Sequence, residues 1–417
     1  MGQPPVTTLP FLLSSVSDTF MASGVVERVR LSRDAGLPAA VASCLAGMSV
    51  DAPESVLVGA IAFDRARPMD LVRPVLVTRG RSWDEAWSLH GGAALPGITD
   101  EAQHGALVPG IWRVTPEPSR ADYEAAVASA TASMADDVEQ AVAEPLRKVV
   151  LSRSLLLNST APIDLPRLLA RLRLDPSVTT FSTPLPSGAD GNVRTLVGAT
   201  PELLLSKSGH TVMSHPLAGS TPRRPSPSED RAAAEALMRS DKDLREHAAV
   251  VESIADVLTP FCTSLDFAPL PALVSTATMW HLGTRITGRL RDDAVSSLEL
   301  LDAVHPTPAV CGVPQPRAQS LITELEGFDR DYFTGAVGWC DARGDGRWMV
   351  TIRCAEVSGT RARLYAGAGI VIGSDPAGEG AETSAKFETM LRALSAQEVV
   401  SRVNRPVAIS LGEPQHV

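Results

Sequence analysis

The chain has 417 residues, a formal net charge of −10 and 44% hydrophobic residues. The length allows one large domain or two to three small ones, and the apolar content is enough for a large core. The acidic balance argues against a nucleic-acid-binding surface. The five cysteines show no CxxC spacing, which argues against a zinc site or a disulfide framework and fits a reducing interior.

The sequence gives no sign of export or of a membrane span. No basic head followed by an apolar core stands near the N-terminus. No apolar run reaches the roughly 18 residues that a transmembrane helix needs. We therefore expect a cytoplasmic protein, and we find no internal repeat or low-complexity tail that would indicate a solenoid or a linker.

Residues 1–118 are predicted to be rich in strands, because short apolar runs such as Val56–Phe63 alternate with Pro and Gly. A helix is predicted from about residue 120 to 143, where apolar residues recur at helical spacing until Pro145.

Two ionisable residues lie within apolar, strand-like runs. Lys148 opens one run and either extends to the surface or is buried, where it loses its proton readily and can act as a base. Glu202 lies in a predicted strand over 195–205, between a Thr-Pro corner and three leucines. It is either exposed at a strand end or, in an apolar pocket, a carboxyl with a raised pKa that can act as a general acid.

Residues 215–228 are predicted to form a loop in which Gly219 and Ser220 could offer a backbone N–H and a hydroxyl to a ligand. The helix after it carries Asp243 and Glu246 at i, i+3, a carboxylate pair on one face. We assign the adjacent His247 to core packing.

The C-terminal half predicts a strand over 279–289, a helix over 294–304, a rigid proline-rich loop over 305–314 and an antiparallel meander. The predicted strand 348–357 places Arg353 in its middle. An arginine there is costly unless paired, so we expect a carboxylate partner from the protein or from a ligand.

The stretch from Ala366 to Lys386 is predicted as a strand end, a turn with Gly367 and Gly369, and a helix. On that helix Glu379, Glu382 and Lys386 share one face, which suits a hard cation together with an anion, although a solvated helix face is the alternative. The GxGxxxG spacing from Gly367 suggests a dinucleotide-binding oxidoreductase, but no βαβ unit follows it.

Together these motifs resemble the chorismate-utilising enzymes, which include isochorismate, salicylate, anthranilate and aminodeoxychorismate synthases. The similarity covers roughly residues 120–394 in the order of the family. The matching segments are KVVLSR from Lys148, GATPELLL from Gly198, PLAGST from Pro216, SDKDLREH from Ser240, HPTPAVCG from His305, VTIRCA from Val350, AGAGI from Ala366 and GEGAETSAK from Gly378.

The resemblance implies one large α+β domain over 1–417, with two packed, largely antiparallel sheets flanked by helices, as in anthranilate and aminodeoxychorismate synthases. Residues 1–118 would be its strand-rich N-terminal part and 120–394 its catalytic part. It also implies Mg²⁺ on Glu246 and Glu382, supported directly or through water by Asp243 and Glu379. The family usually has Glu where this chain has Asp243, which favours a water-mediated role there.

The implied substrate is chorismate, a dianion. Mg²⁺, Gly219 and Ser220 would hold its ring carboxylate. The enolpyruvyl carboxylate would be held by Arg353, Lys386 and the backbone of Gly367, Ala368 and Gly369. The resemblance also assigns substrate contacts to His281, Ala309 and Phe333, the last at a position that is often Tyr in the family.

Lys148 favours an isochorismate synthase, an isomerase in which water is the nucleophile, because the ammonia-using members generally lack this lysine. Lys148 would take a proton from water attacking C2, and Glu202 would protonate the leaving C4 hydroxyl. No redox cofactor and no glutaminase subunit would be needed, and we expect a monomer. A salicylate synthase, which then eliminates pyruvate, is the alternative. A siderophore, menaquinone or other salicylate-derived pathway for the product stays open.

Overall fold

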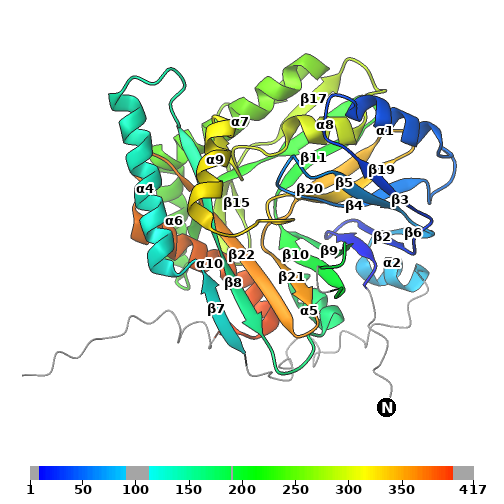
Figure 1. Ribbon diagram of the computed structural model, residues 1–417, viewed down its shortest axis with the longest axis horizontal. Helices are drawn as coiled ribbons and strands as arrows, with labels where there is room; N and C mark the ends of the chain where they lie inside the picture. The colour runs from blue at the N-terminus through cyan, green and yellow to red at the C-terminus, as the bar shows by residue number, and fades with distance from the viewer. Residues whose placement is uncertain (1–8, 91–111, 189–190, 398–417) are drawn as a thin grey trace, which may run out of the picture.

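The computed structural model describes residues 9–90, 112–188 and 191–397. Its architecture is two large sheets packed face to face, a small third sheet, and helices on the outer faces (Figure 1). All strand pairings within the described ranges that form these ladders are antiparallel, for example β22 with β8 over ten residue pairs and β10 with β9 over seven. The α+β fold with two packed antiparallel sheets is therefore confirmed.

The two large sheets draw strands from the whole described chain. The ten-stranded sheet runs in the order β18 (Gly312–Val313), β8 (Lys148–Asn158), β22 (Arg361–Ile370), β21 (Cys354–Ser358), β10 (Arg194–Thr200), β9 (Thr179–Leu185), β1 (Phe11–Ser14), β2 (Thr19–Ser23), β6 (Leu76–Gly80), with β7 (Arg113–Glu117) also on β8. The nine-stranded sheet runs β14 (Cys262–Phe267), β17 (Ile286–Leu290), β12 (Thr211–His215), β11 (Leu203–Ser208), β20 (Gly346–Val350), β19 (Ala336–Asp341), β4 (Val56–Ile61), β5 (Met69–Arg73), β3 (Glu27–Leu31). The small sheet is β13 (Leu217–Pro222), β16 (Met279–Gly283), β15 (Ala272–Ser275).

The helices cover the outer faces. They are α1 (Leu37–Ala46), α2 (Trp83–Leu89), α4 (Arg120–Glu139), α5 (Leu165–Leu172), α6 (Pro227–Arg239), α7 (Asp241–Leu258), α8 (Ser297–Val304), α9 (Gln315–Glu326) and α10 (Pro376–Leu394). A short 3-10 turn, Thr259–Phe261, follows α7. Among the described residues, no helix is both long and apolar enough to cross a bilayer.

The hydrophobic core is layered in the same way. One cluster lies between the two large sheets and contains Phe181, Met349 and Tyr365 from both of them. A second packs α1, α7 and α8 on the nine-stranded sheet, and a third packs α2, α5 and α10 on the ten-stranded sheet. The strand-rich prediction for the N-terminal part is confirmed where the structure describes it, because its strands complete both sheets.

Three predicted strands are wrong as single strands, because each passes from one sheet to another. Residues 195–205 break at Pro201 and Glu202 between β10 and β11, and 348–357 break at 351–353 between β20 and β21. Residues 279–289 break between β16 and β17. A strand that changes sheets needs a bend, and a local pattern of apolar residues does not reveal it. Arg353 is therefore at a bend and not in mid-strand.

Two further predictions need correction. The expected loop over 215–228 contains strand β13, which carries Gly219 and Ser220 and pairs with β16. Gly367 and Gly369 lie inside β22, paired with Ser152 and Val150, and not in a turn. The turn falls at 371–375, where Asp375 caps α10 by accepting from the N–H of Gly378. The local sequence of these two glycine-containing segments predicts a loop and a turn. Pairing with strands that are distant in the chain makes them strands instead.

Candidate active site

A small cavity lies where the two large sheets exchange strands, between α7 and α10. It is lined by residues of β8, β13, β16 and β22, of the bends at 201–202 and 351–353, and of the 305–311 loop. The predicted site residues that line it are Glu202, Gly219, Ser220, Glu246, His281, Ala309, Phe333, Arg353, Gly367, Gly369, Glu382 and Lys386. Thus most of the predicted set, which spans about half of the chain, comes together around one space.

Four predicted residues do not line this cavity. Lys148 lies behind Glu246, with its Nζ 3.0 Å from Glu246 Oε1. Ala368 packs in an apolar cluster with Val149 and Ile370. Asp243 packs beside Gly219, whose φ of +79° and tight neighbours exclude a larger residue. Glu379 is buried and paired with Lys242 at 2.5 Å.

Glu202 and Arg353 occupy adjacent bends. The N–H of Val350 donates to Glu202 O at 3.1 Å, and the N–H of Ala199 donates to Arg353 O at 3.1 Å. Arg353 has φ +50°, a left-handed conformation that costs energy for a residue with a side chain. The second bend therefore holds a strained arginine beside the first bend's carboxyl group.

Burial controls the protonation of both groups. It raises the pKa of Glu202 to about 7, although the charges of Lys148, Arg353 and Lys386 oppose the shift. It lowers the pKa of Arg353 to about 10, opposed by the charges of Glu382 and Glu202. A carboxyl group with a pKa near neutrality can hold a proton and release it, which is what a general acid requires.

The Lys148–Glu246 pair is almost completely buried, with Lys148 1% exposed. The sequence left open whether this lysine extends to the surface, and the structure shows that it does not. Its Nζ makes no hydrogen bond of acceptable geometry, despite the short ion-pair distance. A Cβ added to Gly369 would overlap the Glu246 carboxylate and approach Lys148 Cε at 3.1 Å, so β22 needs glycine there.

Helix α10 presents a second lysine–carboxylate pair to the cavity. Lys386 Nζ lies 2.6 Å from Glu382 Oε1 and donates to Gly367 O at 2.8 Å, and Ser220 Oγ donates to Glu382 at 2.8 Å. Burial opposes ionisation of Glu382, but Lys386 and Ser220 outweigh it and lower its pKa. This carboxylate is therefore charged and faces the cavity.

His281 differs from the other polar groups of the wall. Burial, together with the positive charges of Arg353 and Lys386, lowers its pKa well below the usual value, so its ring is neutral. Its Nε2 is buried without a hydrogen-bond partner. A buried ring nitrogen without a partner is costly in a protein interior and is available to a ligand.

The carboxylates of α7 and α10 lie close enough together to affect one another's pKa. Burial raises the pKa of Asp243, and the charges of Glu246 and Glu382 add to the shift. Burial likewise raises the pKa of Glu379, with Glu382 adding to it. Within the described residues, no three His, Cys, Asp or Glu side chains are grouped so that they could hold a metal ion by themselves. Mg²⁺ commonly takes one or two carboxylates plus waters and ligand oxygens, so Glu246 and Glu382, which line the same cavity, fit it.

Two buried arginines that the sequence reasoning missed support the site from behind. Arg153 donates to Thr383 Oγ1 at 2.9 Å and to Ser384 Oγ at 2.6 Å, which fixes α10 against β8. Arg330 donates to the carbonyls of Val150 and Val310, both at 2.7 Å and both in cavity-lining residues. The sequence did contain a signal for Arg153, because it lies inside the apolar run of β8. A buried cation requires partners, so its position indicates a structural or functional role.

An aromatic pair, of which Phe333 was predicted and Tyr365 was not, closes one side of the cavity. Phe333 stacks on Tyr365 with ring centroids 4.8 Å apart. His247 lies in the core as expected, with Nδ1 3.2 Å from Ala218 O and Nε2 2.7 Å from Thr284 Oγ1. The contrast with His281 separates a packed histidine from one that faces the cavity.

Comparison with known proteins identifies the family. A family model described as "Chorismate binding enzyme" matches residues 109–395. Isochorismate synthase DhbC of Bacillus subtilis (strain 168) is 42% identical over 396 residues, covering 93% of this chain and 94% of that protein. Isochorismate synthase EntC of Escherichia coli (strain K12) is 40% identical over 337 residues, covering 81% of this chain and 80% of that protein.

Solved structures show the same relationship. The crystal structure of DhbC from Bacillus anthracis superposes with a TM-score of 0.81 at 39% identity and covers 93% of this chain and 96% of that one. Anthranilate synthase component I of Streptococcus pneumoniae shares the fold alone, with a TM-score of 0.67 at 19% identity over 93% of this chain and 94% of that one. This chain therefore belongs to the family of chorismate-binding enzymes.

Proposed function

We propose that this protein is an isochorismate synthase, an isomerase that converts chorismate to isochorismate with water as nucleophile. The observation that carries the proposal is the buried Lys148 paired with Glu246, a residue that lines the same cavity as Glu202. The resemblance makes this lysine the feature that separates water-using from ammonia-using members. Relatives of about 40% identity that are named isochorismate synthases support it.

The reaction would be an allylic displacement. Water attacks C2 and gives a proton to Lys148, while Glu202 gives its proton to the C4 hydroxyl, which leaves as water. The raised pKa of Glu202 supports its role as the acid, because a carboxyl group with a pKa of about 7 is half protonated near neutral pH. Water as nucleophile makes an ammonia-supplying partner unnecessary.

The substrate's two carboxylates would meet different walls. Arg353 and Lys386 are the cations of the cavity wall suited to the enolpyruvyl carboxylate, together with the backbone at Gly367 and Gly369. Gly219, Ser220 and a Mg²⁺ held by Glu246 and Glu382 would take the ring carboxylate. When bound, Mg²⁺ would supply charge neutralisation and orientation of that group.

A product assay tests this function. Purified enzyme with chorismate and Mg²⁺, and without ammonia, should form isochorismate and release no pyruvate. Stoichiometric pyruvate would instead show a salicylate synthase, which shares most of these residues. Turnover that requires ammonia would contradict water as the nucleophile.

The base is tested by Lys148→Ala. This variant should bind chorismate but lose at least a hundredfold in isochorismate formation, because general-base catalysis contributes roughly 10²–10⁴-fold. Ammonia at high pH is itself a deprotonated nucleophile, so it should restore some 2-amino product in Lys148→Ala. A wild-type rate in Lys148→Ala would show that the lysine is structural.

A further inference from the structure

Helix α10 is held in place differently along its two halves, residues 376–386 and 387–394. The buried residues of the second half are apolar and belong to the cluster on the ten-stranded sheet: Phe387, Met390, Leu391, Ala393 and Leu394. The buried residues of the first half are a carboxylate, a glycine and a threonine, Glu379, Gly380 and Thr383. The first half also carries Glu382 and Lys386 to the cavity. Apolar packing therefore contributes little to fixing the part of α10 that serves the site.

Arg153 of β8 makes hydrogen bonds to this first half from the sheet. It is completely buried and donates to Thr383 Oγ1 at 2.9 Å, to Ser384 Oγ at 2.6 Å and to Gly380 O at 3.3 Å. Its guanidinium carbon lies 5.3 Å from the ring centroid of Phe387, where the apolar half begins. A planar guanidinium is a rigid fork of donors, so contacts with three positions on adjoining turns hold the helix in one orientation.

The positions that Arg153 holds and the positions that face the cavity lie on different sides of the same turns. With about 3.6 residues per turn, the mean direction of Gly380, Thr383 and Ser384 is roughly a third of a turn away from that of Glu382 and Lys386. A rotation of this half of the helix about its axis would therefore break the contacts with Arg153 and displace Lys386 at the same time.

The polar groups that Arg153 contacts do not need it as a partner. Thr383 Oγ1 and Ser384 Oγ each donate to Gly380 O, at 3.0 and 2.8 Å, so both hydroxyls keep an acceptor when the arginine is removed. Nη1 of Arg153 has no hydrogen-bond partner, and its contacts among the described residues are hydroxyls, a carbonyl and two aromatic rings, without a carboxylate. A buried cation with such partners costs stability, which indicates a role in the site.

We propose that Arg153 is a positioning residue that sets the rotation of the first half of α10 and thereby directs Lys386, together with Glu382, at the cavity. Arg153 does not line the cavity, so it acts through the helix and not on the substrate. The inference rests on the proposed function, in which Lys386 holds the enolpyruvyl carboxylate. A displacement of about 1 Å in a group that positions a substrate can cost on the order of a hundredfold.

Hydrogen exchange tests the geometry without substrate. In Arg153→Met the amides of residues 380–386 should exchange about tenfold faster than in the wild type, whereas those of 387–394 should keep their rate because apolar packing still holds them. The urea midpoint should be no lower than that of the wild type, because the variant removes a buried charge. Unchanged exchange in 380–386, equal acceleration along the whole helix, or a clearly lower midpoint would each overturn the proposal.

Steady-state kinetics at saturating Mg²⁺ test the effect on the substrate. Arg153→Met should raise KM for chorismate by about tenfold or more and leave kcat within about threefold. The matched control is Arg171→Met, which removes an arginine that donates to Ala393 O and Ser395 Oγ at the other end of the same helix. This control should keep KM within about twofold. Ser384→Ala removes one acceptor of Arg153, replaces Arg153→Met if that variant does not fold, and should raise KM about threefold. A wild-type KM in the folded variant would overturn the proposal.

A double-mutant cycle shows whether Arg153 acts through Lys386. In the Lys386→Ala background, adding Arg153→Met should change KM by less than about twofold, because the group that Arg153 positions is then absent. Increases in KM that simply multiply would overturn the proposal, since independent sites have additive free energies. Failure of the proposed function looks different. The unaltered enzyme would then form no isochorismate, while the hydrogen-exchange result, which needs no substrate, would stand.

Discussion

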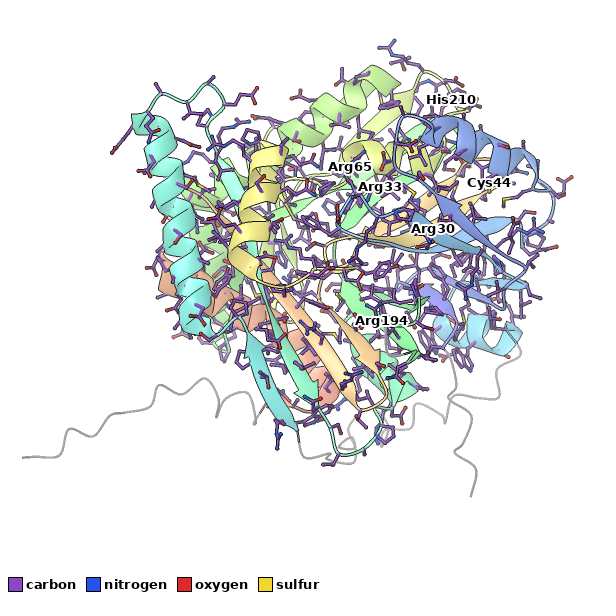
Figure 2. All side chains as sticks on the ribbon, in the orientation of Figure 1. Arg30, Arg33, Cys44, Arg65, Arg194 and His210 are labelled. Carbon is purple, nitrogen blue, oxygen red and sulfur yellow. The ribbon has the colours of Figure 1, made fainter. Side chains whose placement is uncertain are left out.

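Two of the clusters of charged side chains among the described residues are built differently. The first, called here the Asp302 cluster, consists of Arg33, Arg65, Asp302 and His305. The second is the wall of the candidate active-site cavity, which includes Glu202, Arg353 and Lys386. Figure 2 shows Arg33 and Arg65 next to each other near the centre of the molecule, and both donate to Asp302 of α8 at 2.7 Å.

The polar groups of the Asp302 cluster hydrogen-bond to one another and to nearby backbone carbonyls. Arg33 also donates to Ala62 O at 3.2 Å and contacts His305 Nδ1 at 3.2 Å, and Arg65 donates to His305 O at 2.7 Å. His305 Nε2 lies 3.0 Å from Thr334 O, so both ring nitrogens have partners. Burial and the charge of Arg33 lower the pKa of His305 to about 3, so the ring is neutral and accepts from Arg33 at Nδ1.

The cavity wall is left incomplete. His281 Nε2 in the wall has no hydrogen-bond partner, and neither has Nζ of Lys148, which pairs with the lining residue Glu246. Burial raises the pKa of Glu202 to about 7, whereas the carboxylate of Asp302 accepts hydrogen bonds from two arginines. A closed network stabilises structure, whereas unsatisfied buried groups cost stability and are available to a substrate. This difference separates a structural support from a candidate site.

Of the variants considered, Glu202→Gln should have the largest effect on turnover. Gln cannot donate a proton to the C4 hydroxyl, so turnover should fall by about 10²–10⁴-fold, with water or with ammonia as nucleophile. In the wild type, kcat/KM should decrease as pH rises above about 7, where Glu202 loses its proton. Steady-state assays across pH 5–9 measure both effects, and a fully active Glu202→Gln would exclude this acid.

The same variant should be more stable than the wild type at high pH. The folded pKa of Glu202, about 7, lies above the ordinary 4.5, so the folded state binds more protons and stability falls as pH rises from about 4.5 to 7. The shift corresponds to up to about 3 kcal/mol. Denaturant unfolding at pH 8 should show a gain in Glu202→Gln that is absent at pH 4, and equal gains at both pH values would contradict the cause.

Glu246→Gln and Glu382→Gln test whether the carboxylates of the cavity wall hold Mg²⁺. Each should lose more than a hundredfold of the activity at physiological Mg²⁺ and bind Mg²⁺ more weakly by titration calorimetry, because each removes one of the two cavity carboxylates. The circular dichroism spectrum should stay that of the wild type. Wild-type enzyme that keeps full activity after EDTA treatment would show that no metal is needed.

Arg33→Leu tests the Asp302 cluster. The side chain of Arg33 is completely buried, so its loss leaves part of Asp302 and His305 Nδ1 without a partner. Removing one member of a buried pair costs roughly 3–5 kcal/mol, which equilibrium unfolding would detect. Arg65→Leu is the control and should cost less, because Arg65 is 35% exposed.

The readout that separates support from site is the Michaelis constant. The folded fraction of Arg33→Leu should keep KM within about twofold, because Arg33 does not line the cavity. A large increase in KM at full folding would place the Asp302 cluster in substrate binding and remove the distinction drawn above.

Arg353→Ala and Lys386→Ala should have the smallest of these effects and act mainly on binding. Loss of one charge-assisted contact costs on the order of 1.5–3 kcal/mol, or about a ten- to hundredfold increase in KM for chorismate. Arg353→Ala should also relieve the strained backbone conformation only in part, since Ala keeps a Cβ at φ +50°. An unchanged KM in both variants would contradict their assignment to the substrate's carboxylate.

The sequence by itself supplied the candidate residues of the site. Motifs in the family's order pointed to Glu202, Arg353, Glu382 and Lys386, which the structure brings to one cavity, and helical spacing placed the carboxylates of α10 on one face, because helix periodicity is a local property. The antiparallel α+β fold followed from the same resemblance and was confirmed. The sequence also assigned His247 to the core correctly.

Only the tertiary structure decided how these residues meet. The bends at 201–202 and 351–353 arise because each apolar run contributes strands to two different sheets. Local periodicity does not reveal this, because it carries no information on pairing between strands far apart in the chain. The partner of Lys148 is Glu246, almost a hundred positions away, across a space that exists because Gly369 of β22 has no side chain. Burial also depends on the assembled layers, so the pKa shift of Glu202 could be expected from its apolar neighbours but fixed only by the fold.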